Sequence, residues 1–267
     1  MEPYRKLLKS DRWEEWKKDE TDQRKGVPAP PPQKAYPKGA TLIDLVAPDD
    51  LTLGQVPVVE AIRRRRSRRE YTEEPLTLEE LSFLLWATQG LDEEATRAFG
   101  DWLATKDPAA LKARSILRTV PSAGGRHPFE TYLLVNRVRG VESGLYRYLS
   151  MEHNLLFLRA GAELAEQVAD AFMRWVQGSA VVFIWAAIPY RTEWRYSIVA
   201  HKMIAQESGH VCQSLYLASE AIGAGTCAIT YDQAKVDSIL GVDGKEEFAI
   251  YVAPVGKVTP AEYHFDH

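Results

Sequence analysis

The stretch RYSIVAHKMIAQESGHVCQSLYLASEAIG, residues 195 to 223, constrains the fold more than any other part of the chain. It has no internal proline, and its apolar residues recur at helical spacing over most of its length. As one helix it would be roughly 40 Å long at 1.5 Å per residue, and Gly223 fits its C-terminal end. A helix of this length either forms the centre of the core or crosses the middle of a dimer, and the sequence leaves both possibilities open.

Shorter helices and strands are expected on both sides of this helix. Pro57 suits the first turn of a helix in PVVEAIRRRRS, the pattern from Thr77 to Glu80 is a capping box, and Asp232 is a suitable N-cap. The predicted strands are 129–138, a hairpin over 144–161, the wholly apolar run 181–188, and two strands at 225–229 and 247–256; the other predicted helices are 162–176 and 232–241. Because helices and strands mix without regular βαβ alternation, we predict an α+β fold with a helix-covered central sheet.

Composition limits the partners and the compartment. The formal net charge of −4 is unlike that of a dedicated nucleic-acid-binding domain, which is usually basic. The two cysteines, Cys212 and Cys227, cannot form a disulfide framework, which fits a reducing compartment. The N-terminus has no apolar signal-peptide core, and no apolar run reaches the ~20 residues that a membrane span needs. We therefore expect a cytoplasmic protein without a membrane segment.

Two regions differ in composition. Residues 1–56 are charged and include the proline-rich segment KGVPAPPPQKAYPKGA (25–40), which favours extended structure. We predict that they form an extension that lies over the core or links to it; a disordered tail is the alternative. Residues 57–267 are predicted to form the globular domain.

Six arginines fall within seven positions, Arg63 to Arg66 plus Arg68 and Arg69. A guanidinium group binds phosphate in a bidentate manner and stays charged at any relevant pH. If the helix persists, Arg65 and Arg69 lie at i and i+4 and can converge, with the Ser67 hydroxyl between them. The arginine run is therefore either a binding site for one phosphate group or a solvated basic face.

A second segment, RTVPSAGGRHPFETY (118–132), combines a tight turn with small side chains. Backbone there can approach a flat ligand closely, and Ser122 offers a free hydroxyl. His127 is expected to be extended because proline follows it; it is either a proton donor or a structural loop residue.

The third segment, GAGTCAITYDQAKVDSILG (223–241), leads from a strand into a helix, so the N–H groups around Ile229, Thr230 and Tyr231 could face a ligand acceptor. An ordinary strand-to-helix turn is the alternative. The six histidines form no zinc-binding pattern, so we assign no metal. We find no nucleophile elbow or catalytic triad, so we assign no catalytic side chain.

Together, and in this order, these segments resemble the nitroreductase family of flavin enzymes, and within it the SagB-type dehydrogenase branch. RRSRREY (65–71) resembles the family's first flavin-phosphate motif, and PSAGGRHP (121–128) resembles the SagB-type version of its Pro-Ser loop. A long helix ending in IGAG, the DQ-initiated helix, LGVDG and a final APVGK strand complete the pattern. The similarity covers about residues 57–258.

The resemblance implies a nitroreductase-like fold with a mostly antiparallel sheet, in an intertwined homodimer that binds two FMN molecules at the subunit interface. Arg65, Ser67 and Arg69 would hold the phosphate and ribityl chain, with Arg66 nearby, and Lys257 would add to the phosphate site. Pro121, Ser122, Ala123 and Gly124 would come from the partner chain and cover the flavin. Backbone N–H groups near Ile229 and Thr230 would face the flavin ring, although AITYD departs from the family pattern there. Family members often carry a C-terminal arm that wraps the partner, and residues 1–56 are expected to take its place.

The function implied is hydride transfer through flavin N5, between NADH, NADPH or an organic donor and a small acceptor of nitro, quinone or azoline type. Two alternatives remain open. One is an FMN-binding module without turnover, and the other is a nucleic-acid-binding protein that uses Arg63 to Arg69.

Overall fold

A seven-stranded sheet runs through the middle of the computed structural model, which describes residues 5–6, 8–106, 116–172 and 176–259. Every neighbouring pair of strands is antiparallel. The strand order is β1-β4-β3-β2-β5-β7-β6, with bounds β1 Leu42–Asp44, β2 Phe129–Val135, β3 Gly144–Leu149, β4 Asn154–Arg159, β5 Val181–Ala187, β6 Ala224–Thr226 and β7 Phe248–Lys257. The predicted α+β class with a mostly antiparallel sheet is confirmed.

The apolar run predicted to be a central strand is β5, and its seven residues are fully buried. Side chains alternate between the two faces of a strand. Phe183 and Trp185 accordingly enter one core cluster, while Val182 and Ile184 enter the other. A strand with no polar face is stable only when helices cover both sides of the sheet.

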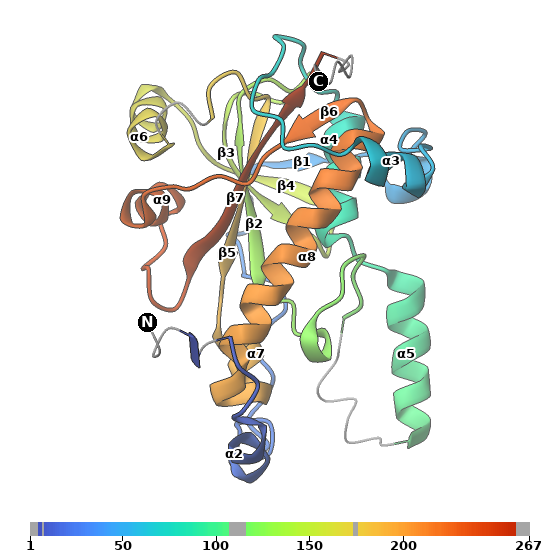
Figure 1. Cartoon of the computed structure of the whole chain (residues 1–267), viewed down its shortest axis with the longest axis vertical. Helices are drawn as coiled ribbons and strands as arrows, with labels where there is room; N and C mark the ends of the chain where they lie inside the picture. Colours follow the sequence, from blue (N-terminus) through green and yellow to red (C-terminus); the bar gives the residue numbers. More distant parts are fainter. Residues whose placement is uncertain (1–4, 7, 107–115, 173–175, 260–267) are drawn as a thin grey trace, which may run out of the picture.

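Helices cover both faces (Figure 1). On one face α4 (Leu78–Gln89) and α8 (Ala200–Ala221) pack, and on the other face lie α6 (Ala162–Phe172) and α9 (Gln233–Leu240). The predicted capping box is present at α4, where the Thr77 hydroxyl accepts from the Glu80 N–H and the Glu80 side chain accepts from the Thr77 N–H. Asp232 caps α9, as predicted, by accepting from the N–H of Lys235 at 3.2 Å. Of the helix predicted over 162–176, residues 173–175 lie outside the described residues, and Val176 lies in a turn.

The long helix predicted over 195–223 is shorter than expected. It begins at Ala200, because Ser197 has a φ of 43° and breaks the helical path between α7 (Tyr190–Tyr196) and α8. A short 3-10 turn, η4 (Ser197–Val199), joins the two. The C-terminal end is as predicted, since Gly223 has a φ of 65°.

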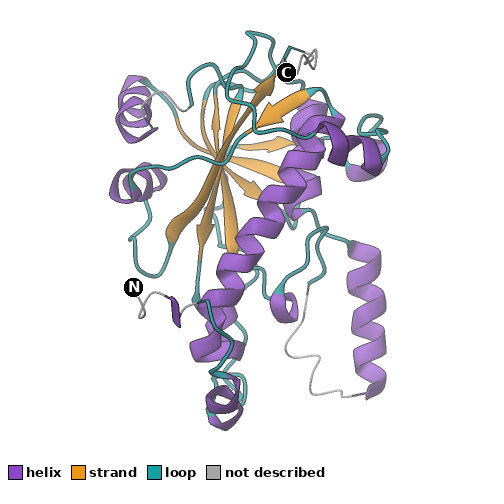
Figure 2. Cartoon of the chain, in the orientation of Figure 1, coloured by secondary structure: helices purple, strands orange, loops and turns teal. Residues whose placement is uncertain are grey.

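Several elements were not predicted from the sequence. They include α2 (Trp13–Lys18), η1 (Pro48–Asp50), α5 (Glu93–Lys106), the strand β1 and all but the last two residues of α7. Helix α5 stands away from the sheet in Figure 2, whereas β1 lengthens the sheet by pairing with β4. Residues 8–56 lie against their own chain: the N–H of Gln23 donates to the Trp194 carbonyl at 2.9 Å, and the Trp194 indole donates to the Val27 carbonyl at 2.9 Å.

No helix of the described ranges combines the length and the apolar character that crossing a bilayer would take.

Candidate functional site

The arginine-rich segment does not continue as a helix. Helix α3 (Val58–Arg64) ends before Arg65, whose ψ of 123° is extended, so the expected i and i+4 placement of Arg65 and Arg69 on one helix is wrong. Ser67 instead forms a parallel bridge with Thr226, and the Arg68 N–H donates to the Thr226 carbonyl at 3.0 Å. Arg65 and Ser67 still meet, for a different reason from the predicted one, because the Arg65 guanidinium lies over the ring of Tyr216, whose hydroxyl lies 3.4 Å from that of Ser67. Ser67 and Arg69 line one groove.

Two glycines allow this segment to lie flat on the end of the sheet. A Cβ added to Gly225 would lie 2.5 Å from Cβ of Arg68, and one added to Gly256 would lie 2.9 Å from the ring of Tyr71. The Tyr71 hydroxyl contacts the Arg68 and Pro254 carbonyls at 3.1 and 3.2 Å and donates to them. Burial raises the pKa of Tyr71 well above its ordinary value, so the phenol stays a neutral donor.

The arginines of the run have different partners. Arg63 and Arg64 both pair with Glu60 at 3.5 Å, and Arg66 donates to the carbonyls of Arg63 and Arg65. The guanidinium of Arg65 lies over the ring of Tyr216 at 5.3 Å. Neither Arg65 nor Arg69 has an ion pair with any described carboxylate. An open groove of about 400 Å³ lies beside Ser67 and Arg69 and is bounded by Arg68, Glu70, Val258 and Thr259.

Tyr216 of α8 joins this segment to the 226–231 turn. Its hydroxyl lies 3.4 Å from the Ser67 hydroxyl and accepts from the N–H of Ala228 at 2.9 Å. Burial raises the pKa of Tyr216, while the contacts with Ser67 and Ala228 lower it. Of the two N–H groups predicted to face a ligand, that of Ile229 donates to the Val252 carbonyl at 3.0 Å and is occupied. The N–H of Thr230 has no hydrogen-bond partner in the described chain, and Thr230 is exposed.

The loop from Pro121 to Gly125 is held by one buried carboxylate. Glu207 of α8 accepts from the Ser122 hydroxyl at 2.7 Å and from the Ala123 N–H at 2.8 Å, so Ser122 is not the free hydroxyl that was expected. Burial raises the pKa of Glu207, and these two donors oppose the rise. Gly124 has a φ of 60°, and a Cβ there would lie 2.8 Å from the Tyr196 hydroxyl. Pro121 is exposed.

His127 is a structural residue of this loop. It is 3 % exposed, its Nε2 lies 2.8 Å from the Ile116 carbonyl, and its N–H donates to the Ser122 hydroxyl. Its φ of 45° is left-handed, so the extended conformation expected before Pro128 is wrong. Burial lowers its pKa to about 3, with a further contribution from the charge of Arg118, and the ring is neutral. Of the two roles left open for His127, the contacts support the structural one.

The structure brings two of the three segments together within one chain. The arginine segment and the 226–231 turn meet at Tyr216, whereas the 121–125 loop is anchored at Glu207, nine residues earlier on α8. Nine residues of α-helix span about 13.5 Å.

Sequence comparison identifies the family. The profile of the nitroreductase family matches residues 62–257, which include all three segments. The chain belongs to the nitroreductase family. A protein of Methanocaldococcus jannaschii that is named as a nitroreductase is 33 % identical over 214 residues, which are 76 % of this chain and 95 % of that protein.

Solved structures agree with the nitroreductase fold. The structure of a protein from Ralstonia eutropha that is named as a nitroreductase superposes on this chain with a TM-score of 0.62 at 22 % identity. The match covers 88 % of this chain and 100 % of the other. One from Anabaena variabilis gives 0.60 at 20 % identity, over 83 % of this chain and 42 % of the other. A chain of the E. coli microcin synthetase complex gives 0.58 at 16 % identity, over 85 % and 79 %.

The contacts of Lys257 do not support its expected place in an anion site of this nitroreductase-family chain. Its ammonium pairs with Glu80 and donates to the Ile222 carbonyl at 2.8 Å, so it joins the start of α4 to the end of α8. The groove beside Ser67 is lined by its neighbours Val258 and Thr259.

Two residues of the site were missed in the sequence. Glu207 lies on the face of α8 that carries the buried Ile204, Val211 and Leu215, whereas Tyr216 lies about two and a half turns further along the helix and so on another side of it. A carboxylate at an apolar helical position is the signal that could have found Glu207, because a buried charge needs specific partners. Tyr216 carries no comparable signal, since tyrosine is common at the edges of cores.

Proposed function

We propose that this chain is an FMN-dependent oxidoreductase that acts as a homodimer, transferring hydride between NADH, NADPH or an organic donor and a small nitro, quinone or azoline-type acceptor. The observation that carries the proposal is the docked segment 65–71. It carries Arg65, Ser67 and Arg69, with no ion pair to a carboxylate for either arginine in the described chain, and the Tyr216 hydroxyl joins it to the turn that holds Thr230. Family membership supports the same reading, because nitroreductases bind FMN.

The residues present fit the phosphate end of FMN. Two guanidinium groups and one hydroxyl are the donor set that a dianionic phosphate needs. The Nε of Arg68 is buried without a hydrogen-bond partner in the described structure, and Arg68 also lines the groove beside Ser67. We assign Arg65, Ser67 and Arg69 to the phosphate and ribityl chain, with Arg66 at the edge of the site.

The ring end would rest on backbone groups rather than on catalytic side chains. We assign the Thr230 N–H as the donor toward the ring, since the Ile229 N–H is already used. The rigid turn from Pro121 to Gly124, fixed by Glu207, would be contributed by the partner chain and cover the ring. When bound, FMN supplies the hydride chemistry at N5, and the protein supplies position and electrostatics.

The test is the flavin content of the purified protein. We expect a yellow protein with the absorption bands of oxidised flavin. Arg65→Ala and Arg69→Ala should each weaken FMN binding about 10- to 150-fold, because a charge-assisted hydrogen bond contributes about 1.5–3 kcal/mol. Arg63→Ala is the matched control from the same run, since Arg63 already pairs with Glu60, and it should retain the wild-type flavin content.

The other readings predict different results. An FMN-binding module without turnover would be yellow but would keep its flavin band when NADH or NADPH is added without oxygen. A nucleic-acid-binding protein would be colourless and bind DNA or RNA with steep salt dependence. The packing of the Arg65 guanidinium over the ring of Tyr216 favours a small ligand over a polymer on a continuous basic face.

A further inference from the structure

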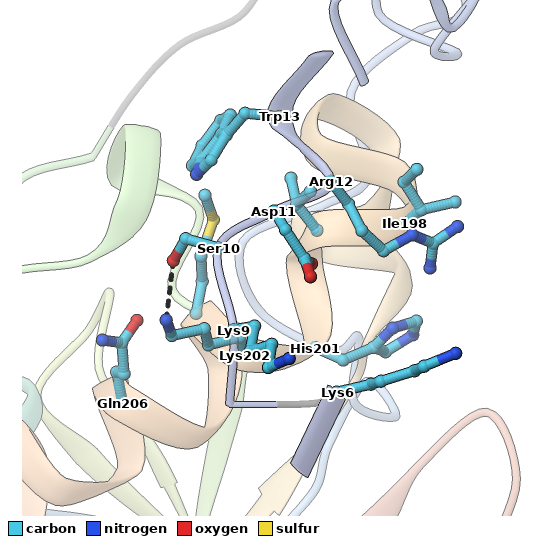
Figure 3. Close-up of a pocket in the computed structure, with 12 residues that line it drawn as sticks. Lys6, Lys9, Ser10, Asp11, Arg12, Trp13, Ile198, His201, Lys202 and Gln206 are labelled. Carbon is cyan, nitrogen blue, oxygen red and sulfur yellow. Dashed lines mark hydrogen bonds between the residues drawn. The ribbon is translucent and has the colours of Figure 1, made fainter. Parts of the chain in front are cut away.

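A large cavity lies between the N-terminal extension, which precedes the nitroreductase match, and the start of α8, which lies within it (Figure 3). Its volume is about 620 Å³, within the range of about 300–1,000 Å³ typical of small-molecule sites. Residues 9–13 form one wall and residues 198–206 form the other. The Lys202 ammonium donates to the Ser10 hydroxyl at 2.7 Å and ties the two walls together.

The cavity is strongly basic. Lys6, Lys9, Arg12 and Lys202 line it, against one carboxylate, that of Asp11. The guanidinium of Arg12 pairs with Glu15 outside the lining, and the ring of His201 contacts Glu193 at 2.8 Å. In contrast, the ammonium groups of Lys6, Lys9 and Lys202 have no ion pair among the described residues. Three uncompensated ammonium groups around one cavity favour an anionic ligand.

The start of α8 adds to this preference. Its N-cap, Val199, offers no capping side chain, and its first turn has no acidic residue and carries His201 and Lys202. A helix N-terminus bears a partial positive charge, so basic residues there are unfavourable unless an anion lies nearby. The N-terminal extension and the start of α8 therefore both contribute positive charge to the cavity.

Part of the lining is apolar or aromatic. Ile198, Val199 and Met203 contribute apolar surface, and the ring of Trp13 lies on the other side of the view from Lys6 in Figure 3. Trp13 packs edge-on against Trp16, which stacks on Tyr196 at 6.0 Å. A ligand that suits both parts of the lining has phosphate groups at one end and a flat ring at the other.

The cavity is linked to the loop assigned to the flavin ring through neighbouring residues. The hydroxyl of Tyr196 limits the space at Gly124, and Gln206 of the cavity lining precedes Glu207, which holds Ser122. A ligand in the cavity is therefore connected to the redox site through two short chains of contacts.

We propose that this cavity binds a phosphorylated nucleoside, with its phosphates on Lys9 and Lys202 and its base against Trp13. This inference rests on the proposed function: for an oxidoreductase that uses NADPH, the ligand is the phosphorylated adenosine end of that molecule. The enzyme would then prefer NADPH to NADH.

The test is calorimetric titration of the full-length protein with adenosine 2′,5′-bisphosphate, adenosine and inorganic phosphate as separate probes. We expect saturable binding of the bisphosphate and much weaker binding of the other two. Lys9→Ala and Lys202→Ala should each weaken it about tenfold, and Trp13→Leu by a similar factor. Lys38→Ala, an exposed lysine of the same extension outside the cavity, should bind as the wild type does.

Each outcome decides the proposal. Absence of bisphosphate binding, or binding that the Lys9 and Lys202 variants leave unchanged, would overturn it, and equal binding of inorganic phosphate would reduce the cavity to a simple anion site. The titration does not depend on flavin, so a colourless protein that binds the bisphosphate refutes the redox proposal alone. A yellow protein that NADH and NADPH reduce equally well refutes the NADPH assignment alone.

Discussion

At the scale of single residues, His127 has a protonation state that the fold determines. The residue is only 3 % exposed. Burial, together with the positive charge of Arg118, lowers its pKa from the ordinary 6.5 to about 3. Between these two values the unfolded chain binds a proton that the folded chain does not bind. The unfolding free energy therefore rises with pH through this window, and the stability is lost as pH falls below about 6.5.

We expect His127→Gln to remove part of this acid sensitivity. The glutamine amide can still donate to the Ile116 carbonyl, but it does not titrate. From pH 7 to pH 5 the wild type should lose up to about 2 kcal/mol more unfolding free energy than the variant does, measured by urea denaturation at both pH values. His210→Gln, at an exposed position of α8, should follow the wild type, and equal losses in all three proteins would refute the assignment.

At the scale of elements, α3 presents an apolar face to solvent directly before the arginine segment. Val58, Val59 and Ile62 are 67 %, 48 % and 58 % exposed. Three exposed aliphatic side chains on a seven-residue helix are unfavourable for an isolated chain. The proposed homodimer gives them a partner and places a subunit interface beside Arg65.

Ile62→Lys should therefore weaken the dimer. We expect its dissociation constant to rise at least about tenfold, since burying an uncompensated charge at an apolar interface costs more than 1.4 kcal/mol, and we expect flavin content to fall with it. Analytical ultracentrifugation over a concentration series measures the change. Met151→Lys, in the exposed turn between β3 and β4, is the control, and a monomeric wild type would contradict the proposal directly.

Elements with local signals were predictable from the sequence. The apolar run of β5, the capping box at Thr77 and the cap at Asp232 each carry their own physical cause within a few residues. Elements that depend on contacts between distant parts of the sequence were not predictable. Strand β1 exists because residues 42–44 pair with β4 more than a hundred residues later, and the break at Ser197 depends on a φ that serine rarely adopts. The 65–71 segment was identified, but its extended form depends on Gly225 and Gly256, which lie far away in the sequence.

At the scale of the whole molecule, the extension completes a buried charge network of the globular domain. Arg147 and Arg191, which are 4 % and 2 % exposed, both approach the single carboxylate of Glu130. Residues 32–35 supply the missing acceptors: Arg118 donates to the Pro32 carbonyl at 3.3 Å, and Arg147 donates to the Lys34 and Ala35 carbonyls at 3.1 and 3.0 Å. The extension therefore forms part of the folded core rather than a tail on it.

Removing residues 1–36 should consequently destabilise the domain even though the whole family match remains. We expect a loss of at least about 3 kcal/mol of unfolding free energy, because buried guanidinium groups would lose their acceptors without gaining carboxylates.

Removing residues 1–10 should leave the unfolding free energy within about 0.5 kcal/mol of the wild type, since the 32–35 contacts remain. The same truncation should abolish nucleotide binding in the basic cavity. Lys34→Ala isolates the side-chain pair with Glu247 from the backbone contacts and should fall between the two truncations. Denaturant unfolding of the three variants separates these roles, and a 37–267 chain as stable as the full-length protein would show that the arginine network does not need the extension.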